Sequence, residues 1–206
     1  DRLFAVRLDG RIHCFGGDRN EFRVHRLPQP VFPTDEWTLQ ARRILETTRV
    51  RDGFAVVWGV PHVRLLVELA RQSSLHIVAV DPDAAEVQSA REQLIAQGMY
   101  GERVVVHVGD PLTFDIPPYF ASLMLCEPDA VPVGDSKVVG ELFQSLRPYG
   151  GVACLSLRSG ESQKLANTAT KCRLANAAIK TSAVGTLLGR TGALPGAGNW
   201  THEPAD

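Results

Sequence analysis

Short apolar runs alternate with amphipathic stretches between residues 35 and 190, and this alternation restricts the possible folds more than any other feature. A continuous apolar run such as Phe54–Trp58 is typical of a strand that is buried on both faces. The amphipathic stretches between such runs indicate helices that cover the sheet. The sequence therefore predicts an α/β fold with a doubly wound, mainly parallel sheet, covered by helices on both faces.

The apolar periodicity and the capping residues place the expected elements along the chain. Thr34 or Asp35 can cap the first helix, and Gly98 can end the third. The expected helices lie at residues 35–49, 62–72, 83–97, 135–146 and 160–175. The expected strands lie at residues 54–58, 75–80, 103–108, 121–126, 151–157 and within 178–190.

Acidic residues follow three of the predicted strands directly. Asp81, Asp110 and Glu127 each stand one or two residues after a strand. The carboxyl ends of parallel strands meet at one edge, and open α/β sheets bind their ligands there. Asp81 also lies 22 residues beyond Gly59, close to the spacing of about 20 residues expected of an acid that binds ribose hydroxyls. We therefore expect a nucleoside at this edge.

The segment that carries these acids resembles the class I, Rossmann-like S-adenosylmethionine-dependent methyltransferases over about residues 35–190. Three strings are similar to common phrases of that family: Val80-Asp81-Pro82-Asp83, Val108-Gly109-Asp110-Pro111 and Leu146-Arg147-Pro148-Tyr149-Gly150-Gly151-Val152. The resemblance implies S-adenosylmethionine as cofactor and an unidentified methyl acceptor. It further implies that Gly59 belongs to the cofactor loop, that Asp81 binds the ribose and that Asp110 faces the adenine. Glu127 stands where the family often places substrate-binding or catalytic residues.

The loop after the first strand departs from the family pattern. With Glu68–Ala70 aligned, Val57 replaces the leading acid, Pro61 the second glycine and Val63 the third, so that only Gly59 remains. Proline fixes φ and lacks an N–H, and a β-branched residue resists the left-handed region. We therefore expect weakened binding of S-adenosylmethionine. A catalytically inactive scaffold or interaction domain is the alternative function.

Each acidic residue also has a structural alternative. Asp81 or, better, Asp83 can cap the helix that follows, Asp110 can start a turn, and Glu127 can be a surface acid. No residue stands out as a general base, but methyl transfer depends mainly on in-line positioning, so an enzyme is not excluded. A nicotinamide-linked dehydrogenase is less favoured, because the loop fits G-x-G-x-x-G no better.

Three residues near the first loop are expected to have structural roles. Trp58, at the end of its strand, is expected in the core. His62 and Arg64 can contact a ligand carboxylate, but an exposed histidine and a solvated arginine at a helix start are the favoured interpretations.

The two flanks differ from the central segment. The runs 3–6 and 11–15, joined through Asp9-Gly10, predict a β-hairpin. This hairpin and Gly196–His202 resemble parts of a repeat of the PQQ-binding-like β-propeller family. The resemblance implies a methyltransferase-like unit inserted in a longer propeller protein, whose propeller portions would be its partners. The expected domains are 1–34, 35–190 and 191–206.

Charge and composition disfavour other classes of protein. Lys and Arg number 22 against 23 Asp and Glu, which leaves no basic excess for binding nucleic-acid phosphates. No apolar run approaches the roughly 18 residues of a membrane span. The four cysteines form no C-x-x-C pair, so no metal site is expected. The compartment stays open between the cytoplasm, if the unit uses S-adenosylmethionine, and the cell envelope, if the parent propeller protein is exported.

Overall fold

The chain divides into two compact units, Asp1–Val31 and Phe32–Asp206, each described here by itself. A computed structural model describes residues 2–7, 12–16, 33–60, 62–127, 130–194 and 196–197. The domain boundaries expected from the sequence stay a prediction.

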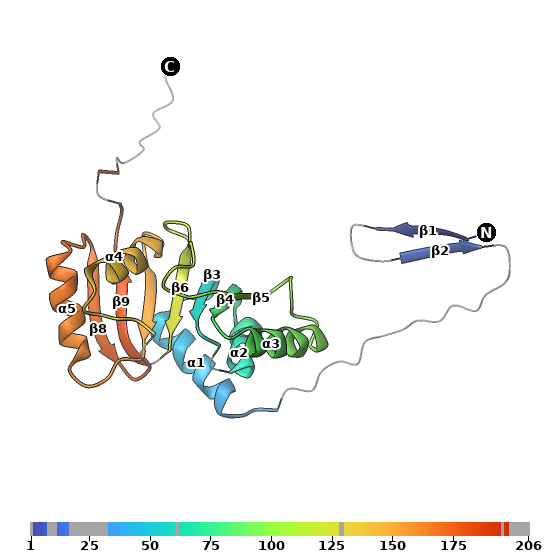
Figure 1. The fold of residues 1–206 in the computed structure, drawn as a ribbon, viewed down its shortest axis with the longest axis horizontal. Coiled ribbons are helices and arrows are strands. Elements are labelled where there is room, and N and C mark those ends of the chain that lie inside the picture. Colours follow the sequence, from blue (N-terminus) through green and yellow to red (C-terminus); the bar gives the residue numbers. More distant parts are fainter. Residues whose placement is uncertain are drawn as a thin grey trace, which may run out of the picture. The chain divides into compact units, whose positions relative to one another are not determined.

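The first unit contains an antiparallel hairpin of two strands (Figure 1). Strand β1 (Arg2–Val6) pairs with β2 (Ile12–Gly16). The expected hairpin is confirmed, although its Asp9-Gly10 turn lies outside the described residues. Every described side chain of the two strands is exposed, because two strands alone enclose no core.

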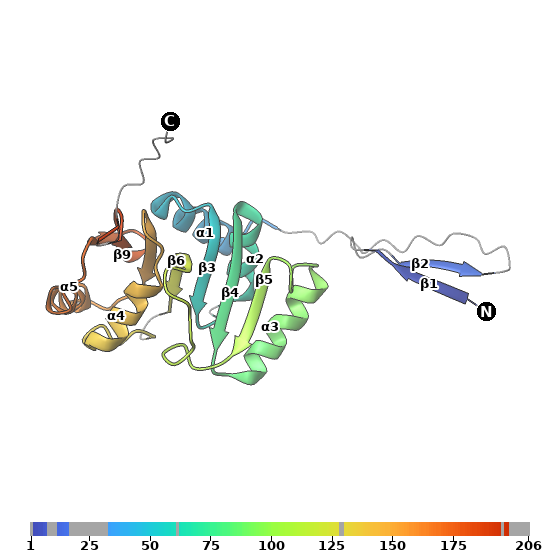
Figure 2. The same cartoon turned by 90° about the horizontal axis from the view of Figure 1, so that it is seen from above.

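The second unit is a sheet with helices packed on it (Figures 1 and 2). Its described strands are β3 (Asp52–Trp58), β4 (Ser74–Asp81), β5 (Val104–Val108), β6 (Ala121–Cys126), β7 (Gly151–Leu155), β8 (Ala177–Ser182) and β9 (Gly185–Arg190). Its described helices are α1 (Glu36–Thr48), α2 (Val63–Gln72), α3 (Ala84–Ala96), α4 (Ser136–Ser145) and α5 (Glu161–Lys171). The predicted α/β fold with a mainly parallel sheet is confirmed.

The order of the strands reverses at β3. Across the sheet the order is β5-β4-β3-β6-β7-β9-β8, and β3 pairs in parallel with both β4 and β6. The chain thus builds outward to β5 and then returns to the other side of β3. Ligands of such sheets bind outside the carboxyl ends of the strands at this reversal.

The last segment of the sheet differs from the expectation. One β segment was expected within residues 178–190, whereas the structure has a hairpin of β8 and β9. Strand β9 runs antiparallel to β7 and to β8, which makes this edge of the sheet mixed. Gly185 supplies the positive φ of +119° near the hairpin turn.

Two apolar layers hold the helices on the sheet. One layer joins the sheet to α1, α2 and α3, and the other joins it to α4 and α5. Trp58 belongs to the second layer and is buried, which confirms its expected place in the core. Fully burying a leucine such as Leu66 or Leu142 contributes about 1.5–3 kcal/mol, so these layers supply the main driving force for folding.

The connection from β5 to β6 contains no helix in residues 109–120, all of which the structure describes. The expected helical cover is therefore incomplete on the face of β3, β4 and β5 that carries Phe54. Phe54, which stays exposed there, stacks on Phe120 with ring centroids 4.4 Å apart.

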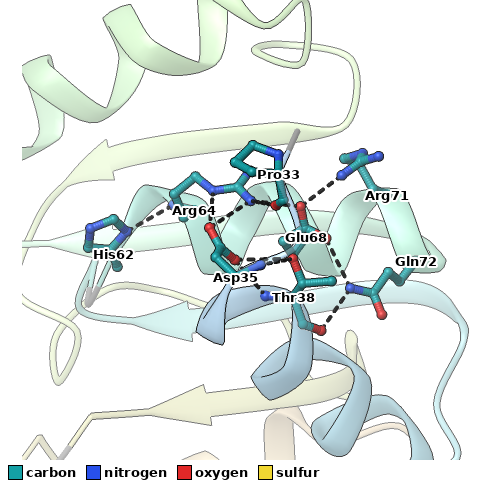
Figure 3. Close-up of polar contacts among 8 residues, drawn as sticks. All are labelled: Pro33, Asp35, Thr38, His62, Arg64, Glu68, Arg71 and Gln72. Atoms are coloured by element: carbon teal, nitrogen blue, oxygen red, sulfur yellow. Dashed lines mark hydrogen bonds and ion pairs between the residues drawn. The ribbon is translucent and has the colours of Figure 1, made fainter. Parts of the chain in front are cut away.

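A polar network fastens α1 to α2 (Figure 3). Asp35 caps α1 by accepting a hydrogen bond from the Thr38 amide at 3.0 Å. The Arg64 guanidinium donates to the same carboxylate from Nε at 3.0 Å and Nη2 at 2.9 Å. The expectation of a solvated Arg64 is therefore wrong, since its side chain is 18% exposed and ion-paired.

Glu68 is the buried centre of this network. Its side chain is 1% exposed and accepts hydrogen bonds from Arg64 at 3.1 Å, Arg71 at 2.8 Å and Gln72 at 3.0 Å. Gln72 also donates to the Thr38 carbonyl of α1 at 3.0 Å. Two arginines thus compensate one buried carboxylate, as a buried charge requires.

Removal of Glu68 is expected to destabilise the protein strongly. Glu68→Ala leaves two guanidinium groups without their buried partner, and breaking a buried pair costs about 3–5 kcal/mol. Glu141→Ala is the control, because its pair with Lys137 is exposed and 3.9 Å long, and such pairs contribute about 0–1 kcal/mol. Urea denaturation measures both changes. Equal small losses in the two variants would contradict the role given to Glu68.

Candidate functional site

The ends of β3, β4 and β6 bring three of the sequence-predicted residues to one edge of the sheet. Gly59 follows β3 and donates its amide to the Val80 carbonyl at 2.8 Å. Glu127 follows β6, and its amide lies 3.4 Å from the Trp58 carbonyl. Asp81 ends β4. Backbone hydrogen bonds thus continue beyond the strands and fix the spacing of the site.

The Asp81 carboxylate holds the loop that follows β3. Its Oδ2 accepts a hydrogen bond from the Val60 amide, and its Oδ1 accepts one from the Asp83 amide, both at 2.8 Å. Asp83 itself caps α3 by accepting from the Ala85 amide at 2.8 Å. The helix-capping role therefore belongs to Asp83. An ionised carboxylate has about four acceptor positions, so Asp81 retains capacity for ligand hydroxyl groups.

Glu127 lies against the backbone of Gly59. Gly59 has φ of +89°, and a Cβ built there would lie 2.7 Å from Oε2 of Glu127. Any larger residue would have to displace this carboxylate and adopt a strained backbone conformation. The positive φ is therefore the main reason for glycine at this position, because the Glu127 carboxylate is the flexible end of its side chain.

Two carboxyl groups share this small region. Burial raises the pKa of Glu127, and the negative charge of Asp81 raises it further. A carboxylate that is desolvated near a second one favours a positively charged or hydrogen-donating neighbour. The site can therefore attract a cation or a group with several hydroxyl donors.

A cavity of about 610 Å³ adjoins Glu127. It lies between α1 and the ends of β6 and β7, and its lining includes Trp37, Gln40, Arg43, Glu127 and Cys154. The Trp37 ring stacks on His62, with centroids 4.4 Å apart and planes 11° apart.

Sequence analysis missed the contribution of α1 to the site. Glu36, Gln40 and Arg43 are spaced so that they share one side of a helix, and all three line the cavity. That polar spacing, visible in the sequence, is the signal that could have indicated this side of the helix. His62 is exposed, as expected, and caps α2 by accepting from the Arg64 amide at 3.2 Å.

The cavity thiols are structural groups. Burial raises the pKa of Cys154 to about 11, and it raises the pKa of Cys126 further. Such thiols remain protonated near neutral pH and are poor nucleophiles. Cys126 and Cys154 are therefore buried free thiols, whereas Cys14 is exposed and Cys172 is partly exposed.

Asp110 forms a turn after β5. Its Oδ1 accepts from the Leu112 amide at 2.9 Å, and its carbonyl accepts from the Phe114 amide at 2.9 Å. The turn-forming alternative is therefore present in the structure, and the side chain is exposed. Contact with an adenine stays a prediction.

Val63 and Pro61 stand where the family pattern has glycine, and the structure describes only the first of them. Val63 is the first residue of α2, and its side chain is buried in the core. Pro61 lies outside the described residues. The effect of both residues on cofactor affinity stays a prediction.

The raised pKa of Glu127 predicts a pH-dependent effect of Glu127→Gln. A raised pKa means that the folded protein binds the proton more tightly than the unfolded chain. Stability is therefore lost as pH rises from the ordinary range of glutamate, about 4.3, through the raised value. Glutamine stays neutral, so the variant should gain Tm relative to the parent at pH 7.5 but not at pH 4.

Thermal denaturation at the two pH values measures this difference. Glu141→Gln, which removes a carboxylate from an exposed pair, is the matched control. A Glu127→Gln effect of the same size at both pH values would contradict the assigned burial of this carboxyl group.

No family model matches the sequence, and no curated protein matches it. Solved structures match the fold. A protein of Methanococcus maripaludis described as an S-adenosyl-L-methionine-dependent methyltransferase superposes with a TM-score of 0.64 at 14% identity, covering 76% of this chain and 84% of that one. The chain has the Rossmann-like methyltransferase fold.

Two other similar structures belong to proteins with different activities. Geranyl diphosphate methyltransferase in complex with S-adenosylmethionine has a TM-score of 0.55 at 13% identity, covering 70% of this chain and 66% of that one. The [4+2]-cyclase SpnF also has a TM-score of 0.55, at 14% identity, covering 69% of this chain and 58% of that one. At these identities the likeness concerns the fold alone.

These similar structures do not support the propeller resemblance of the two flanks. The propeller resemblance of the hairpin stays a hypothesis, and most of Gly196–His202 lies outside the described residues. None of the helices in the described ranges is long and apolar enough to cross a bilayer.

Proposed function

We propose that the α/β unit binds S-adenosylmethionine across the carboxyl ends of β3, β4 and β6 and transfers its methyl group to an acceptor. The observation that carries the proposal is the Asp81 carboxylate at the reversal of strand order, with acceptor capacity left beyond its two backbone bonds. Ribose hydroxyl groups are the donors that such a carboxylate would accept.

The charges near this point support the same ligand. Asp81 and Glu127 place two carboxyl groups beside Gly59, and the sulfonium and amino groups of S-adenosylmethionine are positive. An opposite charge favours the ionised form of Glu127, whereas burial opposes it. Binding of a cation here would therefore lower the raised pKa of Glu127.

Each predicted residue has a defined part in this proposal. Gly59 allows the loop backbone to approach the ligand, Asp81 accepts from the ribose and Asp110 faces the adenine. Glu127 and the adjoining cavity of about 610 Å³ would hold the methyl acceptor. When bound, S-adenosylmethionine supplies an activated methyl group, and the chain supplies positioning and exclusion of water.

The alternative is a non-catalytic scaffold. One observation favours it: both oxygens of Asp81 already accept backbone amides, so the residue has a structural task without any ligand. A binding measurement distinguishes the two functions, because a scaffold is not expected to bind S-adenosylhomocysteine in preference to other nucleosides.

Calorimetric titration with S-adenosylhomocysteine tests the proposal. We expect saturable binding to the full chain and a loss of at least tenfold in affinity in Asp81→Asn. This variant keeps one oxygen that can accept from the Val60 amide but loses charge and acceptor capacity. NADH is expected to give no comparable binding.

Asp83→Asn is the matched control, since asparagine also caps helices and Asp83 accepts only from the α3 backbone. It should bind S-adenosylhomocysteine like the parent. Absence of binding at millimolar ligand, or equal affinity in Asp81→Asn, would favour the scaffold.

A further inference from the structure

A second cavity, of about 290 Å³, lies at the opposite edge of the sheet. It is built around Arg190, the last residue of β9, which pairs with Gly151 at the start of β7. Since β7 runs parallel to β6 and β3, this is the amino-terminal edge of the parallel strands. The cavity is therefore separate from the site at Asp81.

The Arg190 side chain is enclosed by aromatic rings. Its Cζ lies 4.3 Å from the ring centroid of Phe143 and 5.0 Å from that of Tyr119. Only 8% of the residue is exposed. The Tyr119 amide donates to the Gln144 carbonyl at 2.9 Å, which fixes its loop to the end of α4. The guanidinium is thus held in one place before any ligand arrives.

The charge of Arg190 lacks an anionic partner among the described residues. Its Nε is fully buried and donates to no acceptor. No carboxylate occurs in the described lining of the cavity. Aromatic rings offset only part of the cost of burying a guanidinium, and buried charges are normally paired. The positive charge, unmatched within the described part of the chain, therefore favours an anion that enters the cavity.

A second arginine and apolar walls complete the cavity. Arg173 lines it from the segment after α5, and Leu174 and Leu194 contribute apolar surface. Arg173 and Tyr119 have positive φ values of +50° and +64°. At Arg173 this conformation ends α5, where the Leu174 amide donates to the Ala169 carbonyl at 3.2 Å. Two cations beside an apolar wall suit an anion that carries an organic group.

We propose that this cavity binds a small organic oxyanion, a carboxylate or a phosphate monoester. The N–H groups of a guanidinium match two oxygens of either anion. The apolar body of the ligand would lie against Phe143, Leu174 and Leu194. This proposal does not rest on the proposed methyl transfer.

Titration of the full chain with inorganic phosphate, phenyl phosphate and benzoate tests the proposal, in chloride buffer of constant ionic strength. We expect phenyl phosphate or benzoate to bind, and to bind at least threefold more tightly than inorganic phosphate, because the apolar wall adds contacts. The tighter of the two organic anions identifies the headgroup.

Three variants locate the binding. Arg190→Met should lose at least tenfold in affinity, and Arg173→Gln should lose about threefold. Lys180→Gln removes one positive charge from the exposed face of β8 and should bind like the parent. Binding of S-adenosylhomocysteine should be equal in all four proteins, so the result is independent of the site at Asp81.

Stability distinguishes a binding arginine from a structural one. In buffer without organic anions, Arg190→Met should unfold at the same temperature as the parent or higher, because methionine removes an unpartnered buried charge. A marked fall in Tm would overturn the proposal, since the arginine would then serve the core. Absence of binding by both organic anions, or unchanged affinity in Arg190→Met, would also overturn it.

Discussion

Parallel pairing of β3 with β4 on one side and β6 on the other determines where this protein can do chemistry. The three strands end at one edge, so residues distant in sequence, Gly59, Asp81 and Glu127, meet there. The pairing is stable because β3 is covered on both faces by apolar side chains. The site therefore depends on the core, and the core places it at the reversal of strand order.

Sequence patterns predicted the elements of this core well, because apolar periodicity reports burial directly. These patterns failed where the environment of a side chain depends on tertiary contacts. Arg64 looks like a solvated residue at a helix start. Helical spacing relates it to Glu68, four positions later on α2, but no local pattern relates it to Asp35, which precedes α1.

The same limit applies to the candidate site. The acid at the end of β4 was predicted from its spacing to Gly59, yet the hydrogen bonds that its side chain accepts from the Val60 and Asp83 amides depend on the fold of the loop. The cavity wall formed by α1 was not predicted, because polar residues on one side of a helix usually face solvent and do not by themselves indicate a cavity. Arg190 could not be singled out, since its aromatic neighbours come from separate elements.

The fold alone does not decide the activity, because similar structures include methyltransferases and a cyclase. The decision rests on whether a nucleoside occupies the edge at Asp81. The most direct measurement is an NMR titration of the backbone amides with S-adenosylhomocysteine. The account predicts saturable shifts at Gly59, Val60 and Asp81, with the amides around Arg190 unchanged. Shifts absent at Asp81, or spread without preference over both edges, would contradict it.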